Sequence, residues 1–346
     1  MSDKQPKHRR SRPRRAIRIV ALCTGAVLVL CGAGAGWAYW KLNHNLKTVD
    51  LGSELTAPTK DATGAMNILV LGSDSRSGAN GSLAGGNTDG TARSDTAMVV
   101  HVNEAHTAAT VVSIPRDTLV DRPACGTNAA ASGVMFNTAF EVGGASCAVK
   151  TVESMTGLDM NHYVEIDFAG FAKLIDALGG VDITTTVAIN DDQSGLHLAA
   201  GTHHLGGDEA LAFVRTRHGV GDGSDLGRIE LQQEMMKSVL KQVENLNLFS
   251  SPTKLYSIAD AATSSVTTDS TLGSVNSLLG FAEGLKHIKS TDMTTVTMPN
   301  TTAPSDPNRV VALQPQANEL WAALKADKPV PASVLQLQQK NPADSQ

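Results

Sequence analysis

The chain has 346 residues, of which 41% are hydrophobic, 18% charged and 4% aromatic, and its formal net charge is −5. The first 18 positions hold eight of the 29 basic residues and one of the 34 acidic residues, which leaves 21 basic against 33 acidic residues in the rest. This acidic remainder excludes nonspecific binding to nucleic acid or to an anionic surface. A local group of arginines within it therefore indicates a dedicated anion site.

The N-terminus predicts a membrane anchor. Residues 1–18 form a basic cytoplasmic tail, and the run IVALCTGAVLVLCGAGAGWAYW at residues 19–40 carries no charge. A helix of about 22 residues spans roughly 33 Å, which is enough to cross the hydrocarbon core of a bilayer. The basic flank predicts a single-pass cell-membrane protein with a cytoplasmic N-terminus. The alternative is a cleaved signal peptide, because AGA resembles a small-residue cleavage site, although the apolar run is longer than usual.

Residues 41–64 are polar and predict an extracytoplasmic linker, after which strands and helices alternate up to residue 328. Strands are expected at MNILVLGSD, then as a hairpin at DTAMVVHVN and AATVVSIPRD, and later at MTTVTMP. Helices are expected at residues 137–156, with a weak point at Gly143–Gly144, and at residues 228–246, SVNSLLGFAEGLKHI and NELWAALKAD. The tail, residues 329–346, is expected to be disordered.

Two further segments shape the fold prediction. HYVEIDFAGFAKLIDALGGVDITT predicts a strand, a helix and a strand, with Asp167 as the N-cap of the helix and Gly179–Gly180 at its end. EALAFVRTRH predicts a helical turn followed by a strand. The alternation predicts one α/β domain, residues 65–328, with a mixed central sheet and helices on both faces. Sites in such folds lie beyond the carboxyl ends of strands.

Cysteine usage agrees with export. Cys125 and Cys147 are the only two cysteines outside the apolar run. One pair in an oxidising compartment predicts a disulfide, and two unrelated buried thiols are the alternative.

Charged residues recur at the expected strand ends. Arginine forks bind phosphate oxygens, and carboxylates beside them suit a hard cation such as Mg²⁺. Any single pair of this kind is more often a surface salt bridge, and Asp225 is also a candidate helix N-cap. The joint pattern is what favours a site, and its members are Asp74, Arg93, Asp95, Arg116, Asp117, Arg215, Arg217, Asp225, Arg228 and Gln232.

Six motifs in order resemble the LytR-CpsA-Psr family: NILVLGSDSR, RSDTAMVVHVN, VVSIPRDT, FNTAFEVGG, FAGFAKLIDALGGVDI and ALAFVRTRH…SDLGRIELQQ. The resemblance implies a membrane-anchored phosphotransferase that moves a glycopolymer from a polyprenyl-pyrophosphate carrier onto peptidoglycan. It implies an apolar lipid tunnel between the sheet and the helices. It also implies Mg²⁺ (or Mn²⁺) on Asp74 and Asp95, and pyrophosphate contacts from Arg93, Arg116, Arg215, Arg217, Arg228 and Gln232. The insertion of residues 78–91 between Asp74 and Asp95 departs from the family pattern.

The catalytic group expected from this resemblance is Arg93, Arg116, Arg215 and Arg217. Because the attacking hydroxyl must lose its proton, a carboxylate such as Asp117 or Asp225 is the expected base. Two other functions use much of the same chemistry. One is a noncatalytic regulator that binds polyprenyl phosphates, which has no need of the carboxylates for Mg²⁺. The other is a hydrolase that releases the polymer by attack of water.

Overall fold

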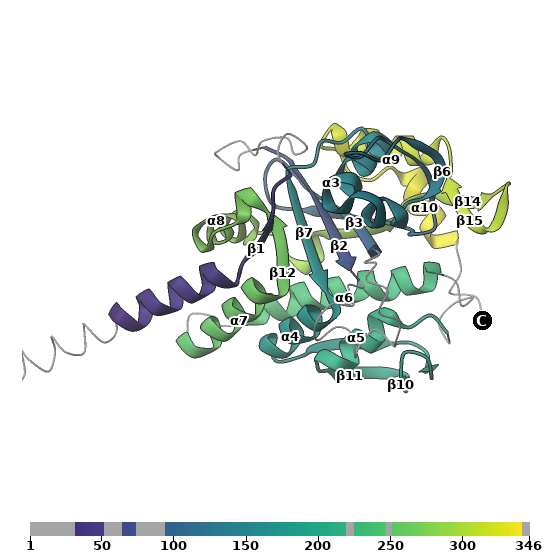
Figure 1. The fold of residues 1–346 in the computed structure, drawn as a ribbon. Coiled ribbons are helices and arrows are strands. Elements are labelled where there is room, and N and C mark those ends of the chain that lie inside the picture. Colours follow the sequence, from purple (N-terminus) through teal and green to yellow (C-terminus); the bar gives the residue numbers. More distant parts are fainter. Residues whose placement is uncertain (1–31, 52–63, 74–93, 219–224, 247–250, 341–346) are drawn as a thin grey trace, which may run out of the picture.

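A computed structural model describes residues 32–51, 64–73, 94–218, 225–246 and 251–340. A mixed seven-stranded sheet lies at its centre (Figure 1). In spatial order its strands are β1 (Lys47–Val49), β12 (Val266–Asp269), β7 (His162–Asp167), β2 (Met66–Ser73), β3 (Ser94–Val102), β4 (Ala109–Ile114) and β13 (Met293–Thr297). The mixed sheet predicted from the sequence is confirmed.

The middle of the sheet is antiparallel and its flanks are mixed. β3 pairs antiparallel with β2 and with β4, as the predicted hairpin requires, whereas β7 runs parallel to β2 and β13 runs parallel to β4. The register pairs Ser73 at the end of β2 with Ser94 at the start of β3. The residues that flank the long insertion therefore lie opposite each other on neighbouring strands.

Helices cover both faces of the sheet (Figure 1). One face packs against α3 (Asn137–Thr156), α9 (Gln316–Lys325) and α10 (Ala332–Lys340). The other side carries α4 (Phe168–Leu178), α5 (Gly207–Arg215), α6 (Asp225–Asn245), α7 (Pro252–Ser265) and α8 (Val275–Leu285). Alternating side chains of β2 serve the two cores: Leu69 and Leu71 belong to the cluster with α3 and α9, whereas Ile68 and Val70 pack towards α6 and α8.

Smaller elements extend this frame. Four two-stranded sheets pair β5 (Leu119–Arg122) with β6 (Ala131–Met135), β8 (Val181–Thr185) with β11 (Gly201–Leu205), β9 (Ile189–Asp191) with β10 (Leu196–Leu198), and β14 (Asn300–Ala303) with β15 (Asp306–Ala312). Among the described residues, η3 (Ser270–Leu272) and η4 (Ser290–Asp292) are short 3-10 helices.

The helix between β7 and β8 has the predicted caps. The side chain of Asp167 accepts the backbone N–H of Gly170, and Gly179 ends α4 in the left-handed conformation that glycine adopts without strain. β8 then leaves the central sheet and pairs with β11. The strand–helix–strand prediction is therefore confirmed, but its two strands belong to different sheets.

The weak point predicted in α3 is the place where a disulfide packs. Cys125 and Cys147 are bonded at an S–S distance of 2.01 Å, which confirms the predicted pair. Gly143 and Gly144 leave helical geometry, and a Cβ on Gly143 would lie 2.7 Å from the Cβ of Cys147. The glycine is needed because the disulfide approaches the backbone so closely.

Three sequence expectations are corrected. EALAFVRTRH does not contain a strand, because residues 207–215 form α5, whose first turn carries two acidic residues and whose Ala210, Leu211 and Phe213 are buried. The supposed disordered tail includes α10, where Val334 is fully buried. Within the supposed linker, Lys47–Val49 form edge strand β1 of the central sheet.

The predicted membrane span lies largely outside the described residues. Its last part, residues 32–40, begins a helix that continues to residue 45. In the part of the chain that the structure describes, no helix has both the length and the apolar character needed to cross a bilayer.

Candidate functional site

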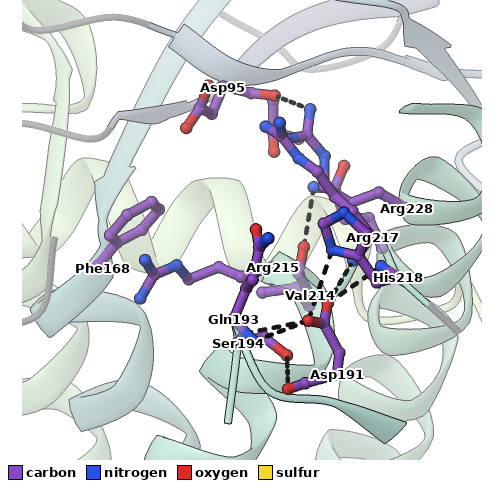
Figure 2. Close-up of a pocket in the computed structure, with 12 residues that line it drawn as sticks. Asp95, Phe168, Asp191, Gln193, Ser194, Val214, Arg215, Arg217, His218 and Arg228 are labelled. Carbon is purple, nitrogen blue, oxygen red and sulfur yellow. Dashed lines mark hydrogen bonds and ion pairs between the residues drawn. The ribbon is translucent and has the colours of Figure 1, made fainter. Parts of the chain in front are cut away.

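A cavity of about 240 Å³ opens where α5, α6 and the starts of β3 and α4 meet (Figure 2). Three arginines line it, two at or just after the end of α5 and one on α6, together with acidic, amide and hydroxyl side chains. The lining residues are Asp95, Thr96, Phe168, Asp191, Gln193, Ser194, Val214, Arg215, Arg217, His218, Arg228 and Gln232. Cationic forks around one cavity make it a candidate anion site.

Arg215 is the last residue of α5, and its guanidinium lies over the ring of Phe168, 4.9 Å from the ring centroid (Figure 2). This cation–π contact holds a flexible side chain in one direction. Arg217 follows two residues later, outside the helix. The two arginines meet at the cavity because the chain leaves a helix there, and not because they lie on the strand predicted within EALAFVRTRH.

Asp191, at the end of β9, organises the segment that carries Arg217. Its carboxylate is 2% exposed and accepts the backbone N–H groups of Gln193 at 2.9 Å, Arg217 at 3.0 Å and His218 at 3.0 Å. Burial by itself raises the pKa of Asp191, but the backbone donors outweigh it and lower the pKa to about 2. Asp191 is therefore ionised at neutral pH and fixes the backbone of the arginine segment.

A second link joins the same two segments. The hydroxyl of Ser194 lies 2.8 Å from that of Thr216, and the fully buried Thr216 hydroxyl donates to the backbone carbonyl of Ala212 at 2.9 Å. The turn between β9 and β10 thus acts as a support for the residues between α5 and α6.

Asp95 connects the start of β3 to two arginines. Its carboxylate accepts a hydrogen bond from Arg116 at 2.6 Å, and its backbone carbonyl accepts one from Arg228 at 2.9 Å. The Arg228 side chain is buried, whereas the Asp95 and Arg116 side chains are 25% and 21% exposed. Asp95 consequently remains open to a ligand, while Arg228 also ties α6 to the sheet.

Arg228 and Gln232, four residues apart, lie on one face of α6 and both line the cavity. The side-chain amide of Gln232 donates to the backbone carbonyl of Val214 at 3.2 Å. Gln232 therefore supports the end of α5 that carries Arg215.

The remaining predicted residues fall into two groups. Asp74 and Arg93 lie outside the described residues, and of Asp225 only the backbone, which begins α6, is described. Arg116 reaches the cavity through Asp95 and is absent from its lining. Asp117 is also absent from the lining, and its carboxylate pairs with Arg116 and Arg309, each at 3.6 Å.

Sequence reasoning missed Asp191, Phe168 and the turn residues Gln193 and Ser194. The stretch NDDQSGLH combines acids with turn formers, which predicts only a surface turn. Phe168 follows the N-cap of α4 and is indistinguishable in sequence from a core residue. Their shared place at one cavity depends on contacts between distant segments.

An apolar cavity of about 210 Å³ adjoins the polar one, between the sheet and helices α4, α5 and α6. The two cavities share Thr96, Phe168, Val214 and Gln232. The apolar cavity is lined by Val70, Gly72, Thr96, Met98, Ile166, Asp167, Phe168, Phe171, Leu211, Val214, Gln232, Met235, Met236 and Val239. A cationic cavity joined to an apolar one suits a ligand with an anionic head and a hydrocarbon tail.

No group of three or more His, Cys, Asp or Glu side chains that would hold a metal occurs among the residues that the structure describes. One of the two carboxylates predicted for Mg²⁺, Asp74, lies outside that set. Asp95 does offer carboxylate oxygens, the ligands that a hard cation takes, at the wall of the anion cavity.

Comparison with known proteins agrees with the family resemblance of the sequence motifs. A model of the LytR_cpsA_psr family matches residues 39–326. The chain belongs to the LytR-CpsA-Psr family. The α/β architecture is that of the family's solved structures.

Two curated members of the family are similar along most of the domain. The cell wall biosynthesis protein LcpA of Corynebacterium glutamicum is 34% identical over 69% of this chain and 51% of its own length, so the chain spans about half of that relative. The polyisoprenyl-teichoic acid–peptidoglycan teichoic acid transferase TagU of Bacillus cereus is 32% identical over 65% of this chain and 71% of its own length.

A solved structure of the family protein YwtF (TagT), with bound octaprenyl pyrophosphate lipid, has a TM-score of 0.57 to this chain. It is 23% identical, and the match covers 81% of this chain and 98% of that one. The likeness establishes the LytR-CpsA-Psr fold.

Proposed function

We propose that this protein is a membrane-anchored phosphotransferase that moves a glycopolymer from a polyprenyl-pyrophosphate lipid onto peptidoglycan through a phosphodiester bond. The observation that carries the proposal is the junction of the arginine-lined cavity with the apolar cavity at four shared residues. A polyprenyl pyrophosphate has the matching shape, with a dianionic head and a hydrocarbon tail. The lipid named for the YwtF (TagT) structure and the transfer named for TagU support the same class of substrate.

The arginines supply the grip on the pyrophosphate. Arg215 ends α5, Arg217 follows two residues later, and Arg228 lines the same cavity from α6 (Figure 2). Guanidinium groups stay charged throughout the physiological range and bind phosphate oxygens in pairs. Aimed at oxygens that gain charge during the reaction, they stabilise its transition state. Arg93 and Arg116 belong to the same proposed group, Arg116 acting through its contact with Asp95.

Asp74 and Asp95 would hold Mg²⁺ or Mn²⁺. The pairing of Ser73 with Ser94 supports this assignment, because it brings together the two strand ends from which these carboxylates follow. When bound, the cation neutralises charge on the pyrophosphate oxygens.

The transfer itself exchanges one phosphorus–oxygen bond for another. A peptidoglycan hydroxyl oxygen attacks the phosphorus that carries the glycan, and the bond from this phosphorus to the bridging oxygen breaks. Polyprenyl phosphate leaves, and the hydroxyl proton passes to a base. We assign this base to Asp225, because it begins the helix that carries Arg228 and Gln232. Asp117 is the weaker candidate, since it pairs with two arginines away from the cavity lining.

The experiment that tests the proposal uses the full chain in nanodiscs, a lipid pyrophosphate-linked glycan, Mg²⁺ and peptidoglycan fragments. A covalent glycan–peptidoglycan product is expected, together with one polyprenyl phosphate per transfer. Bound lipid without turnover would show a regulator that only binds the carrier. Release of the glycan phosphate into water with no peptidoglycan adduct would show a hydrolase.

A further inference from the structure

The second half of the helix of residues 32–45, from Trp37 onward, lies beside α7 (Figure 1). The ring of Trp37 stacks on that of Tyr256, with centroids 6.3 Å apart. One turn further along, the ammonium of Lys41 lies 3.0 Å from the carboxylate of Asp260. Moving four residues along one helix moves the contact four residues along the other in the same sense. The two helices therefore run side by side in the same direction.

The next turn continues the stripe. The side-chain amide of Asn45 donates to Asp260 at 3.0 Å and to Thr263 at 3.3 Å. The backbone N–H of Val275, at the start of α8, donates to the side chain of Asn43 at 3.0 Å. The helix is therefore held by two elements of the domain.

The connection from this helix to the central sheet is very short. Residue 46 alone separates the helix from β1, and β1 pairs along its length with β12 in the central sheet. From Trp37 onward this helix is therefore tied to the domain along one side and at its end. It acts as a rigid mount rather than a flexible tether.

Exposed aromatic side chains gather where the uncharged run of the sequence ends. Trp37, Tyr39 and Trp40 are 57%, 47% and 59% exposed, although large aromatic side chains are usually buried. Tryptophan and tyrosine concentrate at the boundary between hydrocarbon and headgroups of a bilayer. These three residues place the membrane boundary on this stretch of the helix.

The direction of α7 then decides which part of the domain faces the lipid. The first turn of α7 precedes Tyr256 in the chain. Because α7 runs in the same direction as the helix of residues 32–45, this first turn lies at the end of α7 that is nearer to the membrane. Leu255 in that turn is 40% exposed. We propose that the first turn of α7, Pro252–Leu255, rests on the lipid bilayer, and that its pairing with residues 32–45 fixes the orientation of the domain on the membrane. The inference rests on the anchoring included in the proposed function.

Contacts between α7 and α4 connect the proposed membrane surface to the cavities. α4 lies against α7: Lys173 donates to the hydroxyl of Ser264 at 2.6 Å, and a Cβ on Gly170 would lie 2.6 Å from the carbonyl oxygen of Ser265. The first residue of α4 is Phe168, which lines both cavities. The mount would thereby hold the site at a set height above the lipid from which its substrate comes.

The test reads the depth of single labels on the full chain in nanodiscs. An environment-sensitive fluorophore is placed on Leu255→Cys, with Cys23 and Cys31 changed to serine, and the bilayer contains lipids with a nitroxide on the headgroup. A marked loss of emission is expected at Leu255. The matched control is Leu335→Cys on α10, a leucine of similar exposure (38%) at the opposite end of the molecule, where no loss is expected (Figure 1).

A fluorophore on native Cys31, in nanodiscs whose lipids carry nitroxides on the acyl chains, tests separately whether the predicted span is inserted in the bilayer. Quenching at Cys31 with none at Leu255 would overturn the proposed contact while the anchor stands. No quenching at either position would contradict the anchor as well.

Charge reversal tests the mount. Lys41→Glu should reduce the loss of emission at Leu255, because two carboxylates would then face each other, and adding Asp260→Lys should restore it. Transfer activity in detergent, where no bilayer is present, serves as the check that both variants are folded. Unchanged quenching in folded Lys41→Glu would show that the helix pair does not set the orientation.

Discussion

The buried carboxylate of Asp191 accepts the backbone N–H of Arg217 at 3.0 Å, so a residue at the end of β9 holds the backbone of an arginine that lines the anion cavity. The same carboxylate lies 3.5 Å from the ring nitrogen Nδ1 of His218. The position of the Arg217 backbone therefore depends on a residue 26 positions earlier in the chain, and this relation is open to direct test.

Asp191→Asn should lower kcat for transfer by about tenfold or more, since a small displacement of a positioning group is costly in a preorganised site. Asparagine keeps the shape but loses the charge that attracts the backbone donors. Steady-state kinetics with the lipid-linked glycan measure the effect. Asp192→Asn is the matched control, because the neighbouring Asp192 side chain is 99% exposed. Equal activity of the two variants would remove Asp191 from the support of the site.

The same carboxylate predicts a pH dependence of folding stability. Its pKa is lowered from 3.8 to about 2, so its stabilisation is present above pH 3.8 and is lost as the pH falls towards 2. The loss amounts to about 2 kcal/mol in the free energy of unfolding. Urea unfolding of the wild type and Asp191→Asn over this range should show their difference narrowing as the pH falls. A difference that stays constant would contradict the lowered pKa.

Arg215→Ala should reduce turnover by roughly tenfold or more, as expected for the loss of a positioned cation at the transferred phosphoryl group. Arg215→Lys should recover part of the rate, because it keeps the charge without the fork. The control is Arg309→Ala on β15, an arginine that pairs with Asp117 outside the cavity lining. An unchanged rate for Arg215→Ala would exclude Arg215 from the site.

Asp95→Asn should raise the Mg²⁺ concentration needed for half-maximal transfer, because an amide is a weaker ligand than a carboxylate for a hard cation. Its side-chain oxygen still accepts from Arg116, so the local structure should persist. Titration of activity with Mg²⁺ measures the shift, and Asp117→Asn should leave the midpoint where it is. If Asp95→Asn retained the wild-type midpoint, Asp95 would not be a metal ligand.

Val239→Trp should fill the apolar cavity and abolish the binding of polyprenyl lipid. Overpacking would cost about 1–3 kcal/mol of stability, so the melting temperature is measured alongside. Mass spectrometry of the purified protein detects retained polyprenyl phosphate. Val243→Trp, four residues later on α6 at a position 39% exposed, is the control. Lipid retained by a folded Val239→Trp would place the hydrocarbon tail elsewhere.

Local pattern was sufficient for much of the fold. The strands β2, β3 and β4 follow from short apolar runs between turn residues, and α4 follows from its periodicity with Asp167 and Gly179 as caps. Local pattern gave the wrong element at α5. This helix has only nine residues, which are too few to tell a helical pattern from an alternating one. In either case Arg215 and Arg217 come at the end of the element. The resulting geometry was wrong, although both arginines do line one cavity.

The sequence by itself determined which chemical groups this protein carries: the arginines and carboxylates expected at an anion site, the cysteine pair and the uncharged run before the domain. Those features are visible because they depend on residue identity and spacing along the chain. Only the tertiary structure decided that Asp191 holds the backbone at Arg217, that Phe168 lies beneath Arg215, and that an apolar cavity adjoins the arginines. These relations join segments far apart in sequence, and they arise only when packing and backbone hydrogen bonds bring those segments together.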